Sequence, residues 1–162
     1  MLIQKSHTVD LSKVKRLTKD HLAIHKQFHN KETNPVMYGD EFPYGTASEP
    51  TLVDRKDIKW RGGRFQTFQS RFGNGNPAQK EISNSITEQG LKLTSPGLSL
   101  IRRADGLYNL TGHTRNGIFE EKGLENCIAT IYEIPEESNA SKFALKLNPK
   151  VDPSGPSRLY DI

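Results

Sequence analysis

The spacing of apolar residues and turn formers divides the chain into short helices and strands. The clearest helix lies in "NPAQKEISNSITEQGL", where Ile82 and Ile86 share one face. Asn76 suits the N-cap of this helix, Pro77 suits its first turn, and Gly90 suits the position just after its end. The pattern therefore predicts a helix from about residue 77 to residue 89.

Strand patterns follow this helix. "SLIRRADGLYNLT" predicts two strands joined by a tight hairpin at Asp105–Gly106, because Asp-Gly supplies the positive φ that such a turn needs. A short helix is predicted from about Thr114 to Lys122, ended by Gly123. "NCIATIYEI" then predicts another strand.

The first third of the chain is less regular. An imperfect helical stripe in "DLSKVKRLTKDHLAIHKQFHN" predicts one or two helices, and a strand is placed near Leu2–Ile3. "KETNPVMYGDEFPYGTASEP" gathers Pro, Gly and turn formers and predicts an ordered functional loop or a linker, before a short strand around Ile58. We therefore expect an N-terminal helical extension with a Pro/Gly-rich loop (1–50), one compact domain (51–150) and a C-terminal tail (151–162) that resembles the start of a further region.

Composition places the chain among soluble proteins with one moderate core: 162 residues, 33% hydrophobic and 26% charged. No apolar run approaches the roughly 20 residues of a membrane span, so we expect a cytoplasmic protein without a membrane partner. The net charge is +4, and residues 1–80 hold 14 Lys and Arg against 8 Asp and Glu, which makes this half the better candidate for a polyanion. The single cysteine, Cys127, lies in an apolar strand and is expected to be an inert buried thiol.

Candidate chemistry gathers where a strand breaks and a helix begins, in "YNLTGHTRNGIFEEKGL". The first turn of a helix leaves backbone N–H groups without partners and attracts anions. Gly112 lets a ligand approach the backbone, Arg115 can grip phosphate oxygens, and His113 and Thr114 add hydrogen-bonding groups. The stretch predicts a phosphate-binding site. The alternative is that Thr111 or Thr114 only caps the helix and Arg115 is solvated.

A second group of residues alternates cations with aromatic rings in "DRKDIKWRGGRFQTFQSRF". Cations neutralise phosphates and rings stack on bases, so this pattern is typical of nucleic-acid binding. The alternative is that some rings are core and the cations solvate a loop. The predicted nucleic-acid contacts are Arg55, Lys56, Lys59, Trp60, Arg61 and Arg64.

Three histidines, His21, His25 and His29, recur every fourth residue and would form one stripe on a continuous helix. Two histidines four residues apart can bind a transition-metal ion, but the outer pair would stand about 12 Å apart. A polar helix face is therefore the default interpretation.

Taken together, these motifs resemble the ParB/sulfiredoxin-like superfamily, including its ParB-like nuclease domain. The resemblance covers roughly residues 53–150 and depends on order and spacing. The matching motifs are a Ser-Ile pair before a helix-ending glycine (Ser85, Ile86, Gly90), a G-x-x-R turn (Gly112, Arg115), a later Gly-Leu pair (Gly123, Leu124) and an upstream Q-x-R (Gln69 to Arg71).

The resemblance implies an α/β (α+β) fold with a mixed sheet flanked by short helices, preceded here by the N-terminal helical extension. It implies a phosphate or nucleotide held by Gly112, His113, Thr114, Arg115, Arg71 and Ser85. His113 stands where sulfiredoxins carry the cysteine of their G-C-H-R turn, which excludes that reductase chemistry. The G-E-R-R turn of CTP-binding partition proteins is also altered, and only Asn148 loosely matches their later asparagine.

The resemblance implies a DNA-acting protein of phage or plasmid type, either a metal-dependent endonuclease or the DNA-binding part of one. DNA is the expected partner. A homodimer is possible in principle, and the sequence does not decide the oligomeric state. The residues with which it would cleave phosphodiesters are His113, Arg115 and Glu120, with Mg²⁺ or Mn²⁺ as the metal. No spacing singles out a carboxylate cluster, so the metal ligands are not assigned. The alternatives are a non-catalytic switch that binds CTP or ATP, and a small-molecule kinase.

Overall fold

The computed structural model describes residues 7–59, 77–111 and 113–147. The helices are α2 (Lys19–Lys26), α3 (Pro35–Tyr38), the 3-10 helix η1 (Arg55–Asp57), α5 (Pro77–Gln89), α6 (His113–Glu121) and α7 (Glu137–Leu147). The strands are β1 (Thr8–Val9), β2 (Thr46–Ala47), β3 (Thr51–Asp54), β4 (Ile58–Lys59), β5 (Leu91–Lys92), β6 (Leu98–Arg103), β7 (Gly106–Thr111) and β8 (Asn126–Glu133).

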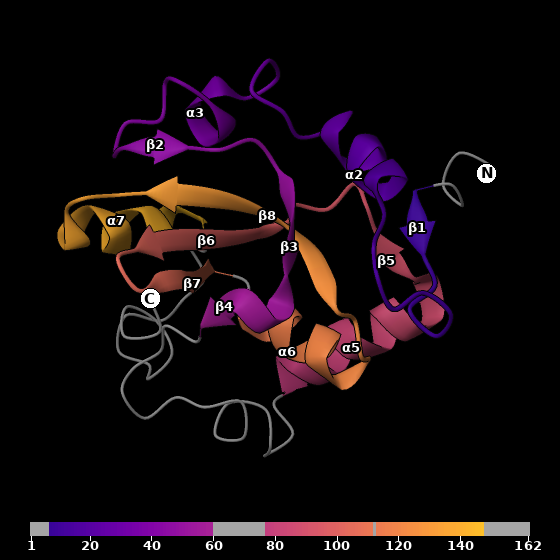
Figure 1. Ribbon diagram of the computed structural model, residues 1–162. Coiled ribbons are helices and arrows are strands. Elements are labelled where there is room, and N and C mark those ends of the chain that lie inside the picture. Colours follow the sequence, from indigo (N-terminus) through magenta and orange to yellow (C-terminus); the bar gives the residue numbers. More distant parts are fainter. Residues whose placement is uncertain (1–6, 60–76, 112, 148–162) are drawn as a thin grey trace.

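Six of the strands form one mixed sheet in the order β2-β8-β6-β7-β4, and β3 also pairs with β8 (Figure 1). β8 runs antiparallel to β2 and β3 and parallel to β6, while β7 runs antiparallel to β6 and parallel to β4. Helices α5 and α6 lie side by side at one end of the sheet in Figure 1. The predicted fold class, a mixed sheet flanked by short helices, is confirmed.

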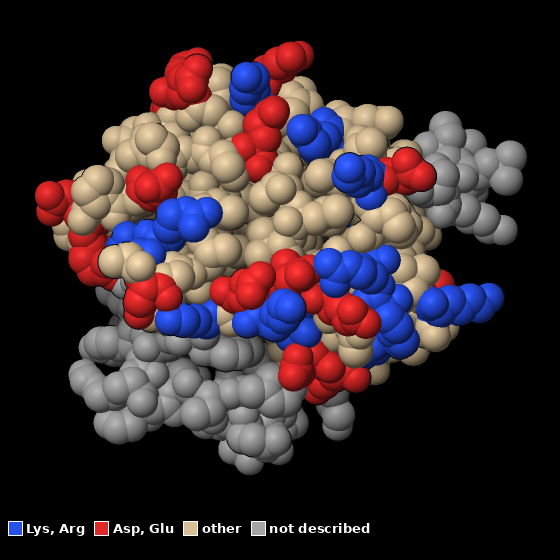
Figure 2. Space-filling view, in the orientation of Figure 1, with Lys and Arg blue, Asp and Glu red and all other residues tan. Residues whose placement is uncertain are grey.

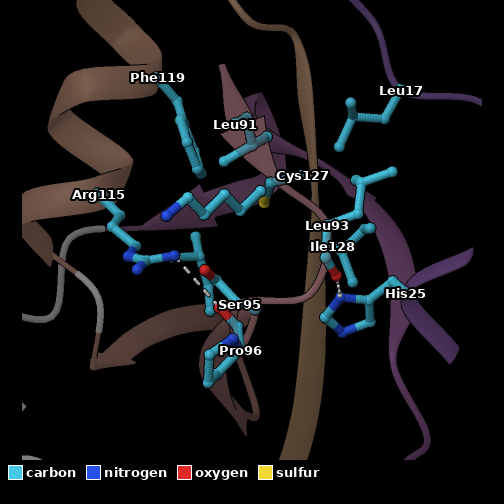
Figure 3. Close-up of a pocket in the computed structure, with 13 residues that line it drawn as sticks. Leu17, His25, Leu91, Leu93, Ser95, Pro96, Arg115, Phe119, Cys127 and Ile128 are labelled. Carbon is cyan, nitrogen blue, oxygen red and sulfur yellow. Dashed lines mark hydrogen bonds between the residues drawn. The ribbon is translucent and has the colours of Figure 1, made fainter. Parts of the chain in front are cut away.

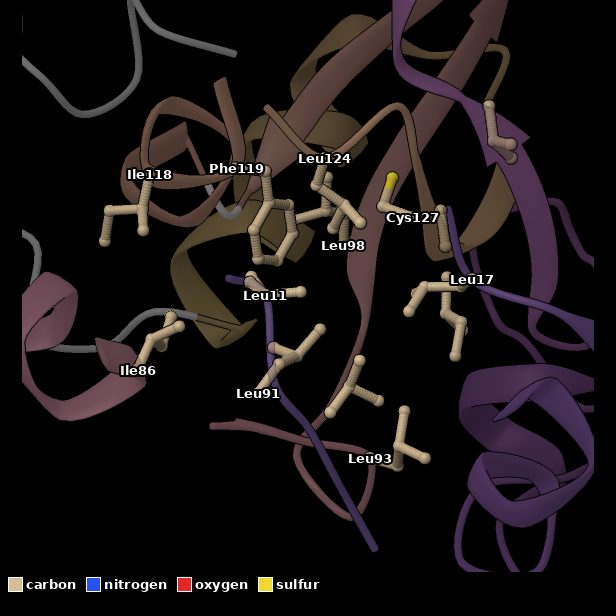
Figure 4. Packing of buried hydrophobic residues seen from close by; sticks show 14 of the residues in the cluster. Leu11, Leu17, Ile86, Leu91, Leu93, Leu98, Ile118, Phe119, Leu124 and Cys127 are labelled. Atoms are coloured by element: carbon tan, nitrogen blue, oxygen red, sulfur yellow. The ribbon is translucent and has the colours of Figure 1, made fainter. Parts of the chain in front are cut away.

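Strand β6 lies at the centre of the core and is buried on both faces. Successive residues of a strand point to opposite faces, so Leu100 enters one apolar cluster and Ile101 the other, both at 0% exposure. The first cluster joins β6 and β8 to α5, α6 and the N-terminal segment through residues such as Leu17, Ile86 and Ile118 (Figure 4). Each such buried side chain contributes roughly 2 kcal/mol through the hydrophobic effect.

The second cluster lies beside α7 and the segment around α3. Phe42, Tyr132 and Phe143 meet there, with ring centroids 4.7 to 4.9 Å apart. Residues before position 50 therefore contribute to both clusters of the core.

Local signals in the sequence predict several elements correctly. Helix α5 ends where Gly90 was expected to end it. The β6–β7 hairpin turns at Ala104–Asp105, and Gly106, the first residue of β7, has the expected positive φ. Helix α6 runs one residue earlier than expected and is followed by Gly123 at φ 73°. This left-handed conformation is accessible to glycine at little cost, which explains the helix end at that position.

Other elements differ from the expectation. The segment predicted as a loop or linker contains α3 and β2, strand β3 precedes the strand expected at Ile58, and α7 was not predicted. Strand β3 exists because its backbone pairs with β8, a contact that no local pattern contains. The strand expected near Leu2–Ile3 and the N-cap Asn76 lie outside the described residues.

Cys127 is buried in β8, as expected, and burial raises the pKa of its thiol to about 12, which favours an inert thiol. None of the described helices is both long and apolar enough to span a bilayer.

Candidate phosphate-binding site

The predicted site lies where β7 passes into α6. Strand β7 ends at Thr111 and α6 begins at His113, so the helix start lies where the sequence predicted it to within one residue. Gly112 and the side chains of His113 and Thr114 lie outside what the structure describes. The described part of the site is therefore built around Arg115.

Arg115 lies in the first turn of α6 and points toward the segment that contains Ser95 and Pro96 (Figure 3). Its Nη1 donates a long hydrogen bond of 3.5 Å to the carbonyl of Pro96. The side chain is half-buried, and this burial lowers the pKa of the guanidinium. Among the described residues no carboxylate pairs with Arg115.

A small cavity lies beside Arg115. Its volume is about 30 Å³, enough for a molecule the size of water. Arg115 and His25 are polar residues of its lining, and its apolar walls include Leu17, Leu91, Leu93, Leu98, Phe119 and Ile128. The cavity in this conformation has no room for a nucleotide base, so a ligand of Arg115 would lie at its mouth.

Arg55, by contrast, has a hydrogen-bond acceptor for each of its three guanidinium nitrogens. Its Nε donates to Asn116 Oδ1 at 2.8 Å, Nη1 to the Leu124 carbonyl at 2.9 Å, and Nη2 to Glu120 Oε2 at 2.7 Å and the Asn116 carbonyl at 3.3 Å. Asn116 also donates to Asn109 Oδ1 at 2.9 Å. The network fixes α6 against η1 and β7 and thereby fixes the direction in which Arg115 projects.

Of the other predicted phosphate and catalytic residues, the structure describes the side chains of Glu120 and Ser85. Glu120 lies at the far end of α6, where it is paired with Arg55. Ser85 is exposed on α5, and Arg71 lies outside the described residues. The roles predicted for these three residues stay predictions.

The predicted nucleic-acid contacts are divided. Arg55 is only 11% exposed and turns inward, whereas Lys56 is exposed. Lys59 donates to the Asp105 carbonyl at 2.7 Å and lies over the ring of Tyr108. Trp60, Arg61 and Arg64 lie outside the described residues.

A second hollow, of about 620 Å³, lies beside Arg55 and Lys56. Its charges are balanced, because Arg16 pairs with Asp54 and Arg55 pairs with Glu120. Balanced charge gives this hollow no preference for an anion.

The histidine stripe is not a polar face throughout, so that interpretation was wrong for His25. His25 is 2% exposed, and its Nδ1 lies 2.8 Å from the Leu93 carbonyl. His29 Nε2 lies 2.8 Å from the Thr94 carbonyl, and its ring stacks on His25 with centroids 4.7 Å apart. Within the described ranges no three His, Cys, Asp or Glu side chains come together as metal ligands.

Sequence reasoning missed the residues that support Arg115 directly or through helix α6. The Pro96 carbonyl and the Asn109–Asn116 pair carry no local signal, because their roles depend on contacts between separate elements. His25 had one readable signal: it falls on the same helical face as Leu22, and that face is expected to turn inward.

Comparison with known proteins gives structural matches only. No protein-family model matches the chain, and no curated protein matches it. One matched structure is the pNOB8-like ParB N-domain, at 16% identity and a TM-score of 0.45, over 64% of this chain and 35% of that one. Another is sulfiredoxin from Arabidopsis thaliana, at 18% identity and a TM-score of 0.40, over 59% of this chain and 96% of that one.

A third match is the C-terminally truncated chromosome-partitioning protein ParB from Caulobacter crescentus complexed with CTP-gamma-S, at 15% identity and a TM-score of 0.45. It covers 64% of this chain and 54% of that one, so the chain spans about a third to a half of these two ParB proteins. The matched structures belong to the two groups that the sequence resembles. At these TM-scores and identities the likeness extends to no site and no activity.

Proposed function

We propose that this chain is a DNA-acting protein in which Arg115 and the start of α6 bind a phosphate group. The observation that carries the proposal is the state of the Arg115 guanidinium, which is half-buried and, among the described residues, has one long bond to a neutral carbonyl. Partial burial removes water from a charge, and the cost is recovered only when an opposite charge or good hydrogen bonds replace that water. A phosphate oxygen supplies both.

The contrast with Arg55 supports this interpretation. Arg55 is more buried, yet its donors meet a carboxylate, an amide oxygen and two carbonyls. Arg115 has no such set among the described residues. It also lies in the first turn of a nine-residue helix, where the helix dipole favours an anion.

The distribution of charge elsewhere favours a local contact. On the face shown in Figure 2, Lys and Arg side chains are mixed with Asp and Glu around an uncharged centre, and several blue side chains stand together over α5 and α6. A basic group of this limited extent suits a short phosphate contact better than a long DNA segment. The segment from Lys56 to Arg64 stays the predicted source of further DNA contacts, since Arg55 faces inward.

Phosphodiester cleavage is the finer form of the proposal. It would use His113, Arg115 and Glu120 with Mg²⁺ or Mn²⁺, and Arg55 would orient the Glu120 carboxylate. A nicking assay on supercoiled plasmid with either metal tests this form separately. A free nucleotide such as CTP or ATP is the alternative source of the same phosphate chemistry, and the binding of each nucleotide is measured beside that of DNA.

The decisive experiment compares Arg115→Ala with Arg102→Ala, which removes the same charge from an exposed position on β6. We expect Arg115→Ala to weaken binding of a fluorescein-labelled DNA duplex, CTP or ATP, whichever binds, by roughly ten- to hundredfold, as losing a charge-assisted hydrogen bond implies. Arg115→Lys keeps the charge but not the fork and should bind with intermediate affinity.

Melting temperatures of the variants show whether the fold is intact. Equal affinity of wild type and Arg115→Ala for all three probes would overturn the proposal, as would an equal loss in Arg102→Ala.

A further inference from the structure

The segment opposite Arg115 is held in place from two sides. It connects β5 to β6 and includes Ser95, Pro96 and Gly97. On one side Gly97 lies against β8, where a Cβ on this residue would stand 2.5 Å from the Ile128 carbonyl oxygen. This close approach fits glycine alone and fixes the end of the segment that follows Pro96.

On the other side the segment is held by His25 in helix α2 and by His29, which follows the end of that helix. His25 Nδ1 and His29 Nε2 each lie 2.8 Å from a carbonyl, those of Leu93 and Thr94. A carbonyl only accepts hydrogen bonds, so each of these ring nitrogens carries a proton and donates. Side chains four residues apart on a helix stand one above the other, which lets the pair reach two consecutive carbonyls.

The orientation of the second ring is fixed by α3. The Tyr38 hydroxyl lies 3.1 Å from His29 Nδ1, so the His29 ring has a partner on both nitrogens. The His25 ring stacks on His29, with ring centroids 4.7 Å apart. His25 also lines the cavity, where Figure 3 shows its bond to the Leu93 carbonyl. Both rings are therefore ordered, and they place two carbonyls just before the one that meets Arg115.

We propose that His25 and His29 are positioning residues for Arg115, acting through the Leu93 and Thr94 carbonyls to set where Pro96 meets the guanidinium. This inference rests on the proposed function in that the positioned group is the phosphate-binding arginine. It makes the N-terminal helical segment a part of the site, although the segment touches no ligand.

The test uses paired substitutions in the full chain. His25→Leu and His29→Leu remove the donors. His25→Asn and His29→Gln place an amide N–H where Nδ1 and Nε2 stand, and so restore the bonds. His21→Leu is the matched control, since His21 contacts Thr18 in the helix cap and not the segment.

Two quantities are measured: the dissociation constant for a fluorescein-labelled DNA duplex, and the NMR resonance of Arg115 Nε, assigned by its loss in Arg115→Ala. We expect each leucine variant to weaken DNA binding by about tenfold, the value of one hydrogen bond, and to shift the Arg115 resonance. The amide variants should stay within about twofold of wild type, because they restore the hydrogen bonds to the two carbonyls. A purely steric role of the histidines would not be rescued by these substitutions.

Amide variants as weak as the leucine variants would overturn the proposal, and so would an unmoved Arg115 resonance in both leucine variants. His29 is only half-buried, so His29→Leu keeps the test available if His25→Leu does not fold. If Arg115→Ala leaves DNA affinity unchanged, the proposed function fails, and the Arg115 resonance still decides the positioning role.

Discussion

Mild acid should destabilise this protein through His25, above the pH range in which carboxylates titrate. Burial lowers the pKa of His25 from 6.5 to about 4, with the neighbouring His29 adding to the effect and the Leu93 hydrogen bond opposing it. A buried imidazole without charge must gain a proton on unfolding below its ordinary pKa. The unfolded chain therefore binds more protons than the folded one between these two values, and the free energy of unfolding falls as pH falls.

The size of the effect follows from the two pKa values. The full difference is worth on the order of 3 kcal/mol, and about 2 kcal/mol of it is lost between pH 7.5 and pH 5. Other groups around His25 are His29, three residues after the end of α2, Lys92 on β5, Arg115 on α6 and Cys127 on β8.

The assay is urea unfolding at about pH 7.5, 6.5, 5.5 and 5, with His25→Asn as the comparison. The asparagine keeps a donor for the Leu93 carbonyl and does not titrate, so its unfolding free energy should stay level across this range while that of wild type declines. The same decline in both proteins would refute the assignment to His25, and a wild-type profile without a decline would refute the buried neutral imidazole.

Two further predictions concern residues near the site. Arg55→Met should lower the free energy of unfolding by about 1.5–3 kcal/mol, because Asn116 and Glu120 lose their partner. Arg102→Met on the surface is the control and should change this free energy little. Equal melting temperatures for the two variants would contradict the prediction. Cys127→Ala should cost about 1 kcal/mol in denaturant unfolding and leave DNA or nucleotide binding unchanged, and a stable variant that no longer binds would point to a thiol mechanism instead.

Elements with strong local signals could be predicted, and elements made by distant pairing could not. Helix α5, the β6–β7 turn and strand β8 each carry their own capping, turn or apolar pattern. Strand β3 has only four residues of mixed polarity and becomes a strand because β8 pairs with it. The sequence of helix α7 does contain a helical apolar pattern, formed by Ala140, Phe143 and Leu147. Turn formers lie on both sides of this segment and made the pattern harder to recognise.

The same division applies to the site. The strand-to-helix break and Arg115 are visible in the sequence because glycine and arginine at a helix start have a local meaning. The inward orientation of Arg55 is not visible, since its partners lie about 60 to 70 residues away along the chain. The local sequence of a cationic segment is the same whether its side chains face solvent or a buried amide.

Strand β8 has three partners in the sheet, and two of them, β2 and β3, come about 80 residues earlier in the chain. On the ribosome these early strands emerge long before the strand that pairs with them. They must wait unpaired until β8 has been synthesised, with edges open to other chains in the meantime. For a cell making this protein, the hazardous period for aggregation thus begins with β2 and ends when β8 leaves the exit tunnel.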